Sequence, residues 1–166
     1  FNPATFLNVI LFLFGKNSSA KILETYAGEA NNGEYFTNAY SQIVLDENAS
    51  VEMVKLQNEA LDSYHISNVD VIQKRTSNFS SYNVNFGGVI VRNNINVNLE
   101  GTGTETVLNG LSLGKETQHI DNHTLISHNN PHCNSHQLYK SIHDGKSRGV
   151  FNGKIFVKQD AQKTNA

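Results

Sequence analysis

Apolar and polar residues alternate with a period of two in several short stretches of the chain. In residues 82–86, Tyr, Val and Phe alternate with Asn, and in residues 94–100, Ile, Val and Leu alternate with Asn and Glu. Successive side chains of a β-strand point to opposite faces of its sheet, so this alternation is typical of strands with one buried face. We predict that the apolar residues of both stretches form that buried face.

Helical spacing of apolar residues is weak along the whole chain. The one window with good helix formers is residues 52–64, but it continues the β-rich residues 51–54, and we expect a strand there. Further short apolar segments recur at residues 43–45, 69–72, 108–113 and 155–157. The pattern therefore predicts an all-β protein with many short strands.

Small polar segments separate the predicted strands and indicate tight corners. They occupy residues 15–19, 46–50, 75–78, 100–104 and 143–147. The first four lie about 25 to 30 residues apart, within the range that is typical of solenoids and similar repeat arrays. Residues 12–22 and 43–53 also share the order strand, corner, strand in one frame. These features favour a β-solenoid whose coils stack on one another.

An antiparallel β-sandwich is the alternative architecture, because short strands with frequent turns fit it as well. Hairpins of that fold often turn on Asn-Gly pairs, which occur here at residues 32–33, 109–110 and 152–153, while long tracts lack them. About one residue in seven is Asn, and in a parallel solenoid stacked Asn side chains can form hydrogen-bonded ladders between coils. We therefore favour the solenoid.

The length and charge of the chain limit the possible classes of function. With 166 residues the chain is of single-domain size, and its 13 Lys and Arg nearly balance its 15 Asp and Glu. It lacks the basic field that binding to nucleic acid or to an anionic membrane requires, so we expect no nucleic-acid partner.

The single cysteine and the apolar start of the chain bear on its location. Cys133 cannot form an internal disulfide, which favours a reducing compartment such as the cytoplasm. The apolar residues 6–14 are about half the length of a membrane-spanning helix, so we expect no membrane insertion. The chain opens on Phe1, which we interpret as an internal cut in a longer sequence.

Six of the seven histidines fall within residues 119–143 and form the candidate chemistry of the chain. In a strand, His119, Asp121 and His123 would point to one face and supply two imidazoles and a carboxylate, a donor set that some metal sites use. The alternative is that these side chains hydrogen-bond to one another on a solvent-facing strand. This spacing allows a metal site without requiring one.

A second, looser group follows the first. His128, His132, Cys133 and His136 could gather around a soft metal, or they could belong to a polar loop around a small, inert cysteine. Nucleophilic chemistry at Cys133 would require a base and an oxyanion site, which adjacency to His132 does not supply. Neither group defines a reaction, so we predict no catalytic residue.

The second half of the chain contains an ordered series of motifs at residues 87–88, 91–94, 99–101, 108–111, 118–124, 131–133, 137–140, 147–157 and 160–164. These motifs resemble the SufD branch of the SufB/SufD family of iron-sulfur cluster assembly proteins. The resemblance is strong from about residue 83 onward and looser over residues 1–60.

The resemblance implies a right-handed parallel β-helix that covers residues 1–166, as the core of a longer protein with helical regions before and after it. It also implies a non-catalytic scaffold that pairs with a SufB-like subunit and a SufC-like ATPase. The iron-sulfur cluster would be handled by the complex, and we expect no cofactor held by this segment. The family's Cys-x-His assembly element has no matching position here, so no site residue is carried over.

Two other classes of function stay open on the sequence alone. A stand-alone metal-binding β-helix domain would use the histidine segment, and mutation of its ligands would abolish binding. A secreted, carbohydrate-active β-helix would carry several acids on one face of a cleft, whereas the acids of this chain are scattered.

Overall fold

The computed structural model describes residues 4–28 and 33–165, and these residues form eleven β-strands and no helix, so none of them belongs to a helix that could cross a membrane. The strands are β1 (Ala4–Phe14), β2 (Ser19–Ala27), β3 (Tyr35–Leu45), β4 (Ser50–Asn58), β5 (Tyr64–Gln73), β6 (Asn78–Asn85), β7 (Ile90–Leu99), β8 (Glu105–Gly114), β9 (His119–His128), β10 (Asn134–His143) and β11 (Arg148–Val157). The all-β prediction is confirmed, and residues 52–64 contain most of β4, a corner and the first residue of β5.

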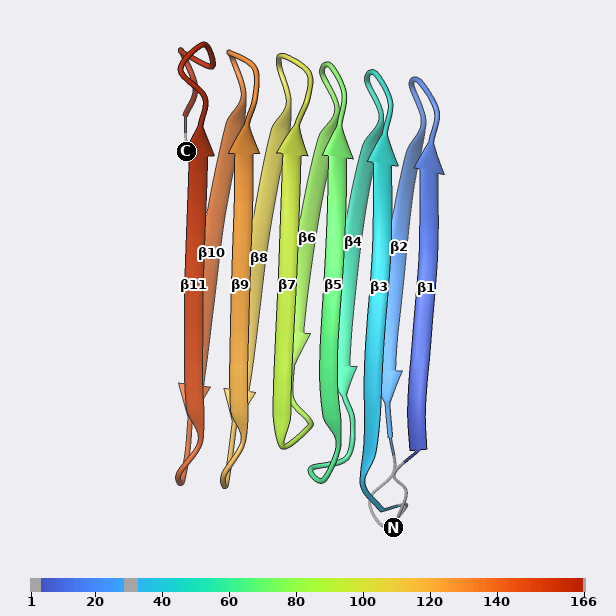
Figure 1. The fold of residues 1–166 in the computed structure, drawn as a ribbon, viewed down its shortest axis with the longest axis vertical. Helices are drawn as coiled ribbons and strands as arrows, with labels where there is room; N and C mark the ends of the chain where they lie inside the picture. Colours follow the sequence, from blue (N-terminus) through green and yellow to red (C-terminus); the bar gives the residue numbers. More distant parts are fainter. Residues whose placement is uncertain (1–3, 29–32, 166) are drawn as a thin grey trace.

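The strands form two parallel sheets that face each other. Sheet A contains the six odd-numbered strands in the order β1-β3-β5-β7-β9-β11, and sheet B contains the five even-numbered strands in the order β2-β4-β6-β8-β10. In Figure 1 the chain runs up the front strands, down the rear strands and advances from right to left, which is a right-handed coil. The predicted right-handed parallel β-helix is confirmed, and the antiparallel sandwich is excluded.

The corners that lead from sheet A to sheet B stack in register. Each contains a residue with positive φ at the equivalent position: Asn17, Asn48, Thr76, Gly103 and His132, with φ between 55° and 70°. The backbone amides of the first four donate to the next coil and continue the inter-coil ladder. The side-chain amide of Asn48 also donates to Oδ1 of Asn17 at 2.8 Å. Asn adopts this left-handed conformation more readily than most residues, which explains part of the Asn content.

The interior between the sheets has an apolar half. Ile43, Val71, Val97 and Ile126 occupy one row of sheet A in register and are all fully buried. Met53, Phe79 and Leu108 of sheet B belong to the same core and are also buried. Ile95, Val97 and Leu99 of β7 point into this core, as the alternation in residues 94–100 predicts.

The prediction for residues 82–86 is wrong, because the structure reverses the faces of β6. Asn83 and Asn85 point inward and are buried, whereas Tyr82 points outward and is 37% exposed. Asn85 lies in register between Gln57 of β4 and Ser112 of β8, so the interior of the solenoid is polar at this height. Tyr82 and Val84 of β6 therefore belong to the outer surface of sheet B, whereas Phe79 of the same strand stays in the core.

Candidate functional site

Lys55 of β4 lies at the centre of the polar half of the interior and is only 4% exposed. Its ammonium group donates to Oγ of Ser67 on β5 and, at 2.9 Å, to Oδ1 of Asn93 on β7. The ammonium also lies 5.3 Å from the ring centroid of Tyr26, in cation–π range. Lys55 therefore connects sheet B to two strands of sheet A across the interior.

Asn93 extends this network toward the C-terminal coils. Its amide nitrogen lies 3.1 Å from Oδ1 of Asn85 and 3.1 Å from Oδ1 of Asn122. The amide of Asn122 then donates to Oγ of Ser112 at 3.2 Å. Both sheets contribute to the chain of hydrogen bonds, so the polar interior holds them together where apolar packing is missing.

An acid–base pair adjoins the lysine. Glu59 lies in the corner after β4 and is buried, with Oε2 2.7 Å from Nδ1 of His65. Thr37 donates to Oε1 at 2.6 Å, and Gln57 donates to Oε2 at 3.0 Å. The ring of His65 also packs edge-on against Tyr26, with the ring centroids 4.6 Å apart. Four strands and a corner thus meet around one buried carboxylate.

Burial and local contacts set the charges in this region. Burial lowers the pKa of Lys55 to about 8, although Glu24 and Glu59 oppose the shift. Burial alone would raise the pKa of Glu59, but the contacts with His65, Thr37 and Gln57 outweigh it and leave the pKa below its usual value. Burial lowers the pKa of His65, so the imidazole is neutral at pH 7. The interior therefore holds the Glu59 carboxylate and a lysine whose pKa burial lowers to about 8.

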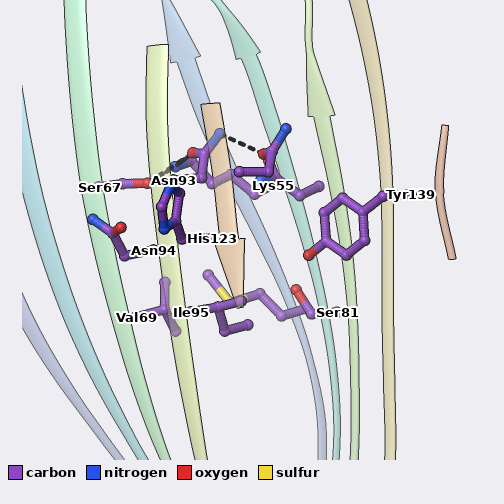
Figure 2. A pocket seen from close by; sticks show the side chains of 12 residues that line it. Lys55, Ser67, Val69, Ser81, Asn93, Asn94, Ile95, His123 and Tyr139 are labelled. Carbon is purple, nitrogen blue, oxygen red and sulfur yellow. Dashed lines mark hydrogen bonds between the residues drawn. The ribbon is translucent and has the colours of Figure 1, made fainter. Parts of the chain in front are cut away.

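A small cavity adjoins Lys55, and Figure 2 shows Ser67 and Asn93 at its polar end and Val69 and Ile95 at its apolar end. The space open to the centre of a water molecule is 20 Å³, which is room for about one water. The side chain of Tyr139 lines the cavity, and burial raises the pKa of its hydroxyl to about 12. The cavity suits a structural water rather than a substrate.

The first histidine group lies on the outer face of sheet A. His119, Asp121 and His123 alternate with inward residues along β9, as the spacing predicts. Nε2 of His123 lies 2.8 Å from Oδ1 of Asp121, and Nη1 of Arg92 donates to Oδ2 of Asp121 at 2.8 Å. Both carboxylate oxygens therefore already have a positively charged or hydrogen-bonding neighbour. A metal ion would have to compete with Arg92 for this carboxylate.

The second histidine group is not brought together. His128 and Cys133 point into the solenoid, whereas His132 lies exposed at a corner and His136 lies on the outer face of sheet B. His128 bonds with Ser135 at 2.9 Å, and the thiol of Cys133 donates to the carbonyl of Gly101 at 3.2 Å. Within residues 4–28 and 33–165, no group of three or more His, Cys, Asp or Glu side chains could hold a metal ion.

Alternation of apolar and polar residues did not predict the polar interior, because alternation alone does not show which face of a strand is inside. The signal that could have found it is the register between coils. Once the corners are aligned, Lys55 falls in one row with Glu24 and Asn83, and Gln57 falls in the next row with Asn85. Rows of polar residues that repeat on the inner face would have indicated a polar interior.

A sequence profile described as "SUF system FeS cluster assembly, SufBD core domain" matches residues 2–166. The chain belongs to this family. The match covers every strand of the structure, so the β-helix described above is the SufBD core domain.

Three relatives of this SufBD chain are similar over most of its length, and the names of the first two agree with the match. An iron-sulfur cluster assembly SufBD family protein of Synechocystis is 33% identical over 95% of this chain and 36% of its own length. The iron-sulfur cluster assembly protein SufD of Escherichia coli is 31% identical over 90% of this chain and 35% of its own length. Protein ABCI7, chloroplastic, of Arabidopsis thaliana is 32% identical over 99% of this chain and 34% of its own length. The chain thus spans about a third of the length of these relatives.

Proposed function

We propose that this chain is the β-helix core of a non-catalytic scaffold subunit in a complex that assembles iron-sulfur clusters. Its partners in the proposal are a SufB-like subunit and a SufC-like ATPase, which would carry out the ATP hydrolysis. The observation that carries the proposal is the family match over residues 2–166, together with 31% identity to a protein named SufD.

The architecture supports a scaffold role. Polar groups inside the solenoid bond to one another across the sheets, and the cavity beside Lys55 has room for about one water. The histidines are divided between the interior and two outer surfaces, so they do not form a shared reaction centre. We propose accordingly that the iron-sulfur cluster is handled by the complex rather than held by this segment, and that the complex works in the cytoplasm.

Anaerobic copurification tests the proposal. The tagged product of the gene that encodes this chain would be expressed with the SufB-like and SufC-like proteins of the same genome. The bound proteins would be identified by mass, and iron and sulfide would be assayed. We expect recovery of both partners, with ATPase activity that depends on the SufC-like protein.

Two outcomes would contradict the proposal. The first is recovery of the protein alone although both candidate partners are present in the extract. The second is a solitary protein that retains metal and loses it when His119 and His123 are replaced by Ala, which would establish the stand-alone metal-binding domain instead. A matched control is His132→Ala, since this side chain lies at an exposed corner away from β9.

A further inference from the structure

The cavity beside Lys55 adjoins a buried polar side chain that needs a partner. Asn83 of β6 lines this cavity and is 9% exposed. Its Oδ1 is buried and has no hydrogen-bond partner among residues 4–28 and 33–165. A buried acceptor that is left unpaired destabilises the folded state, so proteins nearly always pair it with another protein group or with an ordered water. We therefore looked for a donor that the cavity could hold.

The ammonium group of Lys55 brings a hydrogen-bond donor to the same cavity. Lys55 lines the cavity, and its pKa of about 8 keeps most of the amine protonated at pH 7. An ammonium group has three N–H donors, and those of Lys55 bond to Ser67 and Asn93 inside the solenoid. These two contacts leave one N–H for the cavity. A ligand next to it must accept a hydrogen bond.

Tyr139 of β10 reaches the cavity because its ring lies across a glycine. Asn83, Gly110 and Tyr139 are in register on three neighbouring strands of sheet B. A Cβ added to Gly110 would lie 2.3 Å from Cδ1 and from Cε1 of the Tyr139 ring, so any other residue there would push the ring away. The ring also stacks with Phe151, with the centroids 4.6 Å apart. Figure 2 shows the hydroxyl groups of Tyr139 and Ser81 turned toward the space that both residues line.

We propose that the cavity is a binding site for one permanent water molecule, which accepts a hydrogen bond from Lys55 and donates one to Asn83. The hydroxyl groups of Ser81 and Tyr139 complete its set of partners, since a hydroxyl can both donate and accept. Buried waters typically make about three hydrogen bonds, and the 20 Å³ open to the centre of a water exceeds the roughly 10–15 Å³ that one water needs. The water joins β4, β6 and β10, so it extends the hydrogen bonds of Lys55 to β10.

The pattern of donors and acceptors selects water over other ligands of this size. A halide ion would accept from Lys55, but it carries no hydrogen for Oδ1 of Asn83. An ammonium or alkali metal ion would lie beside the positive charge of Lys55, which repels it. Water donates, accepts and carries no net charge, so it fits both Lys55 and Asn83. The inference does not depend on the iron-sulfur role.

Crystals of the full product of the gene that encodes this chain test the inference, at a resolution that shows ordered waters. They would be grown once with sodium chloride and once with sodium bromide, and anomalous scattering would be recorded at the bromine edge. We expect one density peak in the cavity, within hydrogen-bond distance of Nζ of Lys55 and Oδ1 of Asn83, and no anomalous signal there. An empty cavity would overturn the inference. An anomalous peak would overturn it as well, because it would identify a halide site.

Tyr139→Phe tests the role of the tyrosine hydroxyl, because it keeps the ring over Gly110 and removes one partner of the water. We expect the equilibrium constant for urea unfolding to rise about tenfold, which corresponds to about 1.4 kcal/mol. Tyr82→Phe is the matched control, since Tyr82 lies on the outer face of β6, and it should change that constant by less than about twofold. Equal stability of the two variants would overturn the assignment of Tyr139 as a partner of the water. The crystals of the unsubstituted protein decide the inference even if a variant fails to fold.

Discussion

The ammonium group of Lys55 and the amide oxygen of Asn93 lie 2.9 Å apart, although Lys55 projects from sheet B and Asn93 from sheet A. The residues are 38 positions apart in the chain, so the contact fixes the position of one coil relative to the next. A buried amine without such partners would be strongly destabilising. The contact makes the polar interior sensitive to the loss of a single side chain.

Lys55→Ala should lower the free energy of unfolding by about 3 kcal/mol, because it removes the hydrogen bonds that the ammonium donates to Asn93 and Ser67, leaves only the bond from Ser67 to Asn93, and creates a void. Lys55→Met should cost less, about 1 kcal/mol, because it keeps the packing of the stem and removes the buried charge. Urea unfolding followed by circular dichroism measures both. Lys21→Ala is the control, since that lysine is exposed and should change stability by less than about 0.5 kcal/mol. Equal midpoints for wild type and Lys55→Ala would show that the network contributes nothing.

Several strands and the corners at residues 15–19, 46–50, 75–78, 100–104 and 143–147 could be predicted from the sequence, whereas the contents of the interior could not. The corner at residues 46–50 was visible because its polar residues interrupt apolar stretches. Residues 82–86 and 94–100 show the same alternation, yet their asparagines face opposite ways, because the register between coils decides which face is inside. Alternation carries no information on that register.

The sequence was also insufficient to decide the metal-site hypothesis. The sequence placed His119, Asp121 and His123 on one face of a strand, which the structure also shows. It could not show that Arg92, 29 positions away, reaches Asp121 from the neighbouring strand. Contacts between coils are long-range contacts in sequence, so spacing within one strand cannot supply them.

Stability should fall as the pH drops below about 6.5. Burial lowers the pKa of both His65 and His128 in the folded chain, while the unfolded chain takes up protons at its ordinary pKa of 6.5. The unfolded state therefore binds more protons than the folded state below that pH. With two histidines, the free energy of unfolding falls by at most about 2.7 kcal/mol for each pH unit. The Glu59 pKa is also lowered, so a further loss should follow near and below pH 4.5.

Urea unfolding at a series of pH values measures this slope. His128→Gln should make the slope of the free energy of unfolding against pH shallower between pH 5 and 6.5, because one of the two buried imidazoles is gone. This holds whatever the absolute stability of the variant. His132→Gln, at an exposed corner, serves as the control and should leave the slope as it is. A wild-type slope of zero across this range would mean that neither imidazole resists protonation in the folded state.

Gly101→Ala should destabilise the solenoid by about 2 kcal/mol or more. An added Cβ at this corner would lie 2.1 Å from the backbone nitrogen of Arg75 in the preceding coil, so the two coils would have to move apart. Gly15→Ala is a matched corner control, because nothing lies within 4 Å of its added Cβ. Thermal unfolding of the two variants makes the comparison. If Gly101→Ala and Gly15→Ala had the same melting temperature, the close approach of the coils would not be needed for stability.

The Arg92–Asp121 pair should hinder metal binding at the outer histidine row. We expect the chain to retain less than one equivalent of zinc after gel filtration, because the guanidinium lies 2.8 Å from Oδ2 of Asp121 and His123 lies 2.8 Å from Oδ1. Arg92→Ala frees one oxygen and should increase the zinc retained, as measured by elemental analysis. The same substitution should change the free energy of unfolding by less than about 1 kcal/mol, because the pair is partly exposed. Stoichiometric zinc in the wild type, lost in both His119→Ala and His123→Ala, would instead show that a metal ion displaces Arg92 from this carboxylate.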